Sequence, residues 1–119
     1  MYSPEVLDHF KNPRNAGDLA NATAVAEATN PVCGDVLRLA VRAENGRIAE
    51  ARFKAQGCVT AVACASALTE LLAGKTLAEC RSISATQISE ILGGLPQATF
   101  HGAQLAADAL TDLLGKLSD

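Results

Sequence analysis

Two cysteines and an aspartate stand at the ends of two neighbouring strand-like segments. Cys33 and Asp35 come just before a segment that alternates between apolar and charged residues, and Cys58 comes just after the next such segment. Thiolate sulfur and carboxylate oxygen are ligands for zinc and iron, and a thiolate also attacks the sulfur of another molecule. If the two segments pair as a hairpin, the three side chains meet at its open end. The spacing therefore predicts part of a metal site or of a sulfur-accepting site.

The hairpin is predicted from residues 36–42 and 48–55, which alternate with a period of two and flank a turn signal at residues 44–46. A two-residue turn at Asn45 and Gly46 would place apolar residues of the first strand on the same face as charged residues of the second. A three-residue loop avoids this burial of charge. The register that it predicts pairs Leu37 with Phe53, Leu39 with Ala51 and Val41 with Ala49, and it places Cys33 opposite Gly57 and Asp35 opposite Ala55.

Cys58 also stands before the longest run of small apolar residues, Val59 to Ala73, which ends at Gly74 as many helices do. A thiol at the start of a helix lies in a positive dipole potential, which favours the thiolate form. The competing interpretation is that Cys33 and Cys58 are merely small buried residues. The convergence of two thiols, a carboxylate and two flanking glycines favours the functional interpretation.

The bulk properties describe one domain, residues 1–119, in which 49% hydrophobic residues suffice for one core. A formal net charge of −3 with mixed signs gives no electrostatic reason to expect nucleic acid or an anionic membrane as a partner. The sequence has no signal-peptide pattern, no apolar stretch long enough to cross a bilayer and no evident disulfide framework. These features predict a cytoplasmic protein with reduced thiols.

Helix-capping signals and hydrophobic periodicity predict the remaining elements. They are a helix from Ser3-Pro4 to about Asn12-Pro13, a loop with an edge strand in residues 16–30, two short helices that begin at Thr76 and Ser84, and a last helix over about residues 103–117. The fold class that follows is α+β. It combines a small antiparallel β-sheet of about three strands, covered on one side by helices, with an N-terminal helix that packs at an edge or stays mobile.

The other two cysteines and His9 are expected to be structural. Cys64 lies six residues after Cys58 and, on a helix, points well away from it among apolar neighbours. Cys80, beside Arg81, is expected to be incidental, and His9 to be a packing or surface residue.

Several short motifs follow one another along nearly the whole chain. They are Tyr2-Ser3-Pro4-Glu5-Val6-Leu7-Asp8-His9-Phe10, Asn12-Pro13-Arg14-Asn15, Cys33-Gly34-Asp35, Ala51-Arg52-Phe53-Lys54, Gly57-Cys58, Gly74-Lys75 and Phe100-His101. As an ordered set they resemble the IscU/NifU N-terminal family of iron-sulfur cluster assembly scaffolds. The resemblance implies a scaffold or carrier and not an enzyme. Such a protein accepts sulfur from a cysteine desulfurase and iron from a donor, builds a [2Fe-2S] cluster and passes it to recipient apoproteins.

The resemblance also assigns roles by position. Cys33 and Cys58 match two of the family's three cysteines that ligate the cluster and accept sulfur, and Asp35 matches an aspartate that keeps the cluster labile. His101 matches the histidine beside the third cysteine and is expected to be a nitrogen ligand. Lys75 matches a lysine that lies near the site in the family.

Two departures from the family pattern bear on function. Gly102 stands directly after His101, where the family has its third cysteine, so ordinary scaffold function is open to question. Residues 95–99 keep only Leu95 and Pro96 of a Leu-Pro-Pro-Val-Lys pattern, so an Hsp70-type chaperone partner is not carried over.

The expected ligand set is Cys33, Asp35, Cys58 and His101, which offers two sulfurs, one oxygen and one nitrogen. Such a set suits tetrahedral zinc in a resting state, ferrous iron, or a labile [2Fe-2S] cluster in which histidine replaces a thiolate. Three functions remain open: a cluster scaffold, a zinc-bound sulfur-transfer accessory, and a regulatory paralogue that binds a desulfurase. In the second, Cys58 or Cys33 is the sulfur acceptor.

Overall fold

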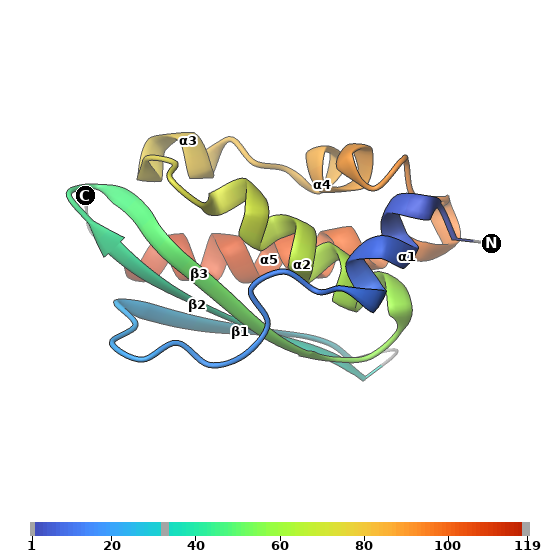
Figure 1. The fold of residues 1–119 in the computed structure, drawn as a ribbon, viewed down its shortest axis with the longest axis horizontal. Helices are drawn as coiled ribbons and strands as arrows, with labels where there is room; N and C mark the ends of the chain where they lie inside the picture. The colour runs from blue at the N-terminus through green and yellow to red at the C-terminus, as the bar shows by residue number, and fades with distance from the viewer. Residues whose placement is uncertain (1, 32–33, 118–119) are drawn as a thin grey trace.

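A computed structural model describes residues 2–31 and 34–117 as an α+β fold, which confirms the predicted fold class. Three strands form an antiparallel sheet in the order β1-β2-β3. Helices α2 and α5 cover one face of this sheet, α3 and α4 lie beyond them, and α1 lies beside α2 (Figure 1). The elements are α1 (Pro4–Lys11), β1 (Ala24–Asn30), β2 (Asp35–Glu44), β3 (Arg47–Gln56), α2 (Val59–Leu72), α3 (Leu77–Arg81), α4 (Ala85–Ile91), the 3-10 turn η1 (Gln97–Thr99) and α5 (His101–Lys116).

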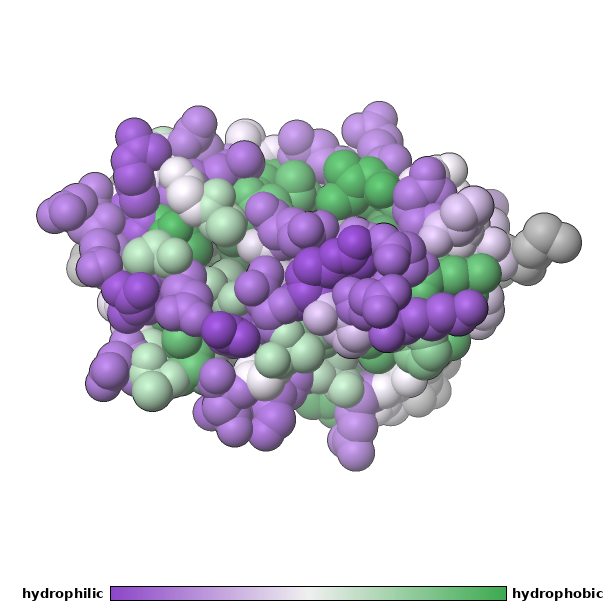
Figure 2. All heavy atoms as spheres, in the orientation of Figure 1, coloured by the Kyte–Doolittle hydropathy of each residue, from purple (hydrophilic) through white to green (hydrophobic). Residues whose placement is uncertain are grey.

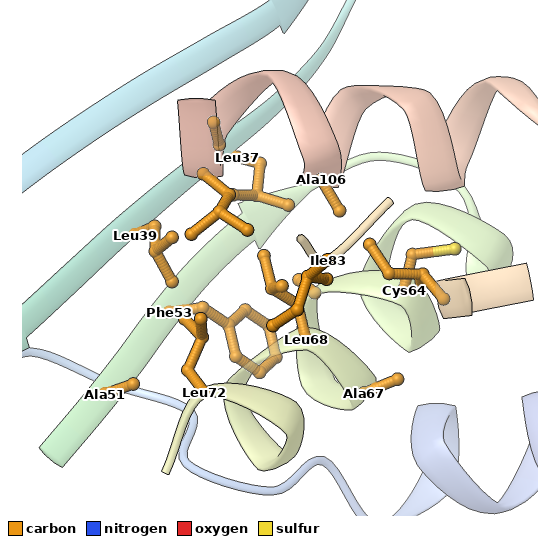
Figure 3. Packing of buried hydrophobic residues seen from close by; sticks show 14 of the residues in the cluster. Leu37, Leu39, Ala51, Phe53, Cys64, Ala67, Leu68, Leu72, Ile83 and Ala106 are labelled. Carbon is orange, nitrogen blue, oxygen red and sulfur yellow. The ribbon is translucent and has the colours of Figure 1, made fainter. Parts of the chain in front are cut away.

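The core lies between the sheet and the layer of α2 and α5. Leu37, Leu39 and Phe53 point from the strands toward Cys64 and Leu68 of α2 (Figure 3). Ten of the fourteen residues of α2 are buried, because the helix lies between the sheet, α1, α4 and α5. An all-round burial of this kind requires a helix without a polar face, and the small side chains of α2 let its neighbours approach closely.

The outer surface in the same orientation is mainly hydrophilic, with apolar residues in separate small patches (Figure 2). Among residues 2–31 and 34–117, the large apolar side chains that remain exposed are Tyr2, Phe10 and Ile91. None of the helices within residues 2–31 and 34–117 has the length and hydropathy needed to cross a membrane.

The hairpin is present, but its predicted register is wrong by two residues. Leu37 pairs with Ala55, Leu39 with Phe53 and Val41 with Ala51. The turn has only two residues, Asn45 and Gly46, whose φ angles of 54° and 74° are typical of a tight hairpin turn. The register then shifts between Arg42 and Ala43, where a bulge leaves Ala49 unpaired in the described sheet. The bulge restores the match of apolar faces that a two-residue turn alone would lose.

The predicted helix starts are confirmed by their capping bonds. The Ser3 hydroxyl accepts a hydrogen bond from Val6 N, with Pro4 next in the chain, and Thr76 and Ser84 each form a complete capping box. The last helix begins at His101, two residues earlier than predicted, so His101 lies in its first turn and not before it.

Helix α1 is fixed to α2 through His9, which is buried. The Ser66 hydroxyl accepts a hydrogen bond from Arg14 N at 2.8 Å and lies 2.8 Å from Nδ1 of His9. Nε2 of His9 lies 3.5 Å from Oε1 of Glu70 on the surface of α2. Of the two expectations for α1, the structure has the packed one, because its buried face lies against α2 and is hydrogen-bonded there.

The free energy of unfolding is expected to fall as the pH is lowered through the histidine range. Burial lowers the pKa of His9 below its ordinary value of 6.5 and Arg14 lowers it further, while Glu70 and Asp8 oppose the shift. The unfolded chain therefore binds a proton at a higher pH than the folded chain. The stability linked to His9 is complete above about pH 6.5 and is lost as the pH falls toward the folded pKa.

Denaturant titrations between about pH 8 and pH 5 measure this dependence. His9→Gln should have a flatter profile than the wild type, and the control His101→Gln should keep the wild-type contribution of His9. An equal slope in His9→Gln and the wild type would contradict the assignment.

Candidate metal centre

Three of the four predicted ligands come from the ends of three different elements. Asp35 is the first residue of β2, Cys58 is the N-cap of α2, and His101 is the first residue of α5. These element ends gather at the end of the sheet away from the β2–β3 turn (Figure 1). Ligand atoms of the three side chains all lie within 4.8 Å of one another.

The donor atoms form a nearly equilateral triangle. Sγ of Cys58 lies 3.7 Å from Oδ2 of Asp35 and 4.0 Å from Nε2 of His101, and Nε2 lies 3.8 Å from Oδ2. A point at equal distance from all three atoms is about 2.2 Å from each, whereas zinc bonds to sulfur, nitrogen and oxygen are about 2.0–2.3 Å long. That point lies in the plane of the three donors, whereas a tetrahedral ion lies outside it. The donors would have to approach one another by about a few tenths of an ångström to bind one tetrahedral ion, whose fourth position would be left to another ligand.

The three side chains differ in exposure. Asp35 is 4% exposed and is the only buried carboxylate among the described residues, while His101 is half-buried and Cys58 is exposed. An ionised carboxylate is costly to bury unless a cation or hydrogen bonds compensate its charge. The Cys58 thiol donates a hydrogen bond to Oδ2 of Asp35 at 3.7 Å, and Nε2 of His101 lies 3.8 Å from the same oxygen. A bound cation would compensate the carboxylate charge more directly than these contacts do.

Cys33, the fourth predicted ligand, lies outside the described residues together with Val32. The residues on either side of this gap are close to the site. Gly34 N donates a hydrogen bond to Asn30 O at 2.7 Å, and Asn30 pairs with Asp35 across β1 and β2. The assignment of Cys33 as a ligand stays a prediction.

Cys64 is buried as predicted, and Cys80, which was expected to be incidental, is buried as well. Burial raises the pKa of Cys64 to about 12, with a smaller contribution from the charge of Cys58, and burial also raises the pKa of Cys80. Both thiols are therefore poor nucleophiles and poor ligands at neutral pH.

Lys75 is not near the metal centre, which corrects the expectation drawn from the family. It follows the C-terminal end of α2, whereas Cys58 is at the N-terminal end. A helix of 14 residues separates them, which corresponds to about 20 Å. Lys75 instead joins α2 to β3 through its carbonyl oxygen, which accepts a hydrogen bond from Ile48 N at 2.8 Å.

Gly102 packs against Thr60, and sequence reasoning did not detect this contact. A Cβ at position 102 would lie 3.1 Å from Cγ2 of Thr60 and 3.3 Å from its backbone C and O atoms. These separations are shorter than the usual 3.5–4.0 Å of carbon contacts. The place of the third family cysteine is thus occupied by the first turn of α2. No local pattern marks Thr60, because the contact joins two helices that are far apart in the sequence.

The thiols are expected to differ sharply in reactivity. In the folded, metal-free protein at about pH 8, iodoacetamide should modify Cys58 at least about tenfold faster than Cys64 or Cys80, because thiolate is the reactive form. Peptide mass spectrometry follows each cysteine separately. In urea the cysteines should react alike, and added zinc should protect Cys58. Rapid modification of Cys64 in the folded protein would contradict its burial.

Gly102→Cys alone is expected to destabilise the fold by about 1–3 kcal/mol, the usual range for overpacking. The loss should be smaller in a Thr60→Ala background, where the Cγ2 atom is absent, although the backbone contacts remain. Denaturant titrations of the wild type, both single variants and the double variant give the coupling energy. An equal loss in both backgrounds would show that the Thr60 side chain does not restrict position 102.

Comparisons with known proteins agree with this architecture. Residues 1–117 match the family described as the NifU-like N terminal domain. The chain is 44% identical over 110 residues to the iron-sulfur cluster assembly scaffold protein IscU 1 of Archaeoglobus fulgidus, covering 92% of this chain and 72% of that protein. It is also 44% identical over 115 residues to the scaffold protein IscU of Azotobacter vinelandii, covering 92% and 88% of the two chains.

The fold is also found in solved structures. The crystal structure of a putative scaffold protein for the SUF system from Fervidobacterium islandicum AW-1 has a TM-score of 0.76 at 22% identity, covering 95% of this chain and 96% of that chain. A NifU-like protein from Brucella abortus has the same TM-score at 20% identity, covering 95% and 91%. From the match over residues 1–117 and the two relatives at 44% identity, the chain belongs to the NifU-like N-terminal domain family.

Proposed function

We propose that this protein is an iron-sulfur cluster assembly scaffold, which holds iron and sulfide as a labile [2Fe-2S] cluster for transfer to recipient apoproteins. The observation that carries the proposal is the convergence of Asp35, Cys58 and His101 within 4.8 Å. It occurs in a chain whose relatives in two organisms are named as scaffolds of this kind. The protein acts as a carrier and not as an enzyme.

The proposed ligands of the cluster are Cys33, Asp35, Cys58 and His101. Thiolate and imidazole both bind iron in [2Fe-2S] centres, whereas a carboxylate is a harder donor that suits iron–sulfur chemistry less well. A mixed set of this kind holds its cargo less firmly than four thiolates would. Weak retention suits a scaffold, because the cluster must leave. The same donors accept zinc in a resting state.

Cys58 is the proposed sulfur acceptor, with Cys33 as the second candidate. Among the described cysteines Cys58 is the exposed one, and it occupies the N-cap position of α2. Its thiolate attacks the outer sulfur of a cysteine persulfide on the partner desulfurase. One S–S bond forms on Cys58 as another breaks, and the desulfurase cysteine leaves as a thiolate. The step therefore exchanges one S–S bond for another, and the transferred sulfur is not reduced in it. The chemistry requires reduced thiols, as in the cytoplasm.

Because Gly102 replaces the third family cysteine, a second function is also considered. A zinc-bound sulfur-transfer accessory, or a regulator that binds the desulfurase, would need the same donors but no cluster. The relatives are named as scaffolds, which favours the scaffold function.

Anaerobic reconstitution with ferrous iron, cysteine and a desulfurase tests the proposal. Visible absorption and Mössbauer spectra should show a [2Fe-2S] cluster that is passed to an apoferredoxin. Cys58→Ser should abolish most of the signal, and the buried control Cys64→Ala should retain it. The Thr60→Ala/Gly102→Cys variant should hold more cluster than the wild type, because it adds a thiol.

Two other results would decide against the scaffold. Stoichiometric zinc in the purified protein, with one added sulfur on Cys58 and no cluster, would establish sulfur transfer instead. Tight binding to the desulfurase with neither sulfur nor cluster on this chain would establish a regulator.

A further inference from the structure

The position of the Asp35 carboxylate depends on the missing side chain of Gly57. Val36 pairs with Gln56, so Asp35 and Gly57 face each other where β2 begins and β3 has just ended. A Cβ at position 57 would lie 2.6 Å from Cγ and 3.0 Å from Cβ of Asp35, and nearer still to Oδ1. Carbon atoms in contact normally lie about 3.5–4.0 Å apart. The carboxylate therefore occupies the volume that any side chain at this position would need.

This close approach brings the carboxylate to the other donors. Gly57 directly precedes Cys58, so the Asp35 side chain passes over the Gly57 backbone before Oδ2 reaches a point 3.7 Å from Sγ. Asp35 is only 4% exposed, and its surroundings are close-packed. A carboxylate expelled from this position would have to turn toward solvent and away from the donor triangle.

The second glycine near Asp35 does not share this property. A Cβ at Gly34 would meet no described atom within 4 Å, although Gly34 directly precedes Asp35 in the sequence. Of the two glycines beside Asp35, Gly57 is therefore the one whose missing side chain makes room for the carboxylate.

We propose that Gly57 is a positioning residue of the metal centre, which admits the Asp35 carboxylate to the donor triangle by leaving its own side-chain volume empty. Gly57 binds no ligand itself and acts only through Asp35. The inference rests on the proposed metal-binding role of Asp35, Cys58 and His101, but it does not require that a complete cluster forms.

Cobalt(II) binding, followed by absorption spectra and by competition with a chelator, tests the inference. The proteins are the wild type, Gly57→Ala, Asp35→Ala, the double variant Asp35→Ala/Gly57→Ala, and the control Gly115→Ala. The control changes a glycine in α5 around which a Cβ would meet no described atom within 4 Å.

Gly57→Ala should weaken cobalt binding at least about tenfold, because losing a residue that orients a metal ligand commonly costs this much affinity. Its spectrum should shift as that of Asp35→Ala does, because both lose the carboxylate. The double variant should bind cobalt within about twofold of Asp35→Ala, since residues that act through one another are not additive. Gly115→Ala should match the wild type.

Two results would overturn the inference. One is unchanged cobalt affinity in Gly57→Ala. The other is a double variant whose loss of cobalt affinity equals the sum of the losses in Gly57→Ala and Asp35→Ala. Such additivity would show that the Gly57 substitution acts through the backbone, where Gly57 has φ of 156°. If Gly57→Ala does not fold, the double variant decides. A folded double variant would support a steric conflict between the alanine side chain and the Asp35 carboxylate. An unfolded double variant would overturn the inference.

The cobalt measurement is independent of cluster assembly. A wild-type protein that binds cobalt through Asp35 but forms no cluster in reconstitution would remove the scaffold function and leave the role of Gly57 intact. A wild-type protein that binds cobalt no better than Asp35→Ala would overturn the role of Gly57 whatever the outcome of reconstitution.

Discussion

The antiparallel pairing of β2 with β3 is the constraint on which the metal centre depends. It brings the beginning of one strand beside the end of the other, so that Asp35 faces Gly57 and stands next to Cys58. The bulge at Ala49 belongs to this constraint, because it reconciles a two-residue turn with matched apolar faces. A slip of one residue would turn Asp35 to the other face of the sheet and separate its carboxylate from the thiol.

The position of His101 depends on a second constraint, the close contact of α5 with α2. Gly102 lies against Thr60 at the point where the two helices begin, and the imidazole reaches within 4.0 Å of the Cys58 sulfur. Because of the same closeness, a side chain at position 102 would require Thr60 to give way. The missing family cysteine and the tight helix contact are thus two aspects of one packing arrangement.

The donors combine a buried oxygen with an exposed sulfur, and this division suits a carried cargo. The Asp35 carboxylate is held inside the fold, where its direction is determined by packing, whereas Cys58 is at the surface, where a partner protein can reach it. A donor set with one hard ligand binds an iron-sulfur cluster less firmly than thiolates alone. In the proposed scaffold function, the fold would thus provide orientation without firm retention, which is what transfer to another protein requires.

Features that depend on local interactions could be predicted from the sequence. Helix starts at Ser3, Thr76 and Ser84 depend on bonds within one turn, and strand alternation depends on neighbouring residues, so both were predictable. The types of the donor groups were also evident. The hairpin register, the contacts of Gly57 and Thr60 and the distance of Lys75 from the metal centre depend instead on tertiary packing. Asp35 and His101 are separated from Cys58 by 23 and 43 positions, and such distances are determined by how whole elements pack and not by any local pattern.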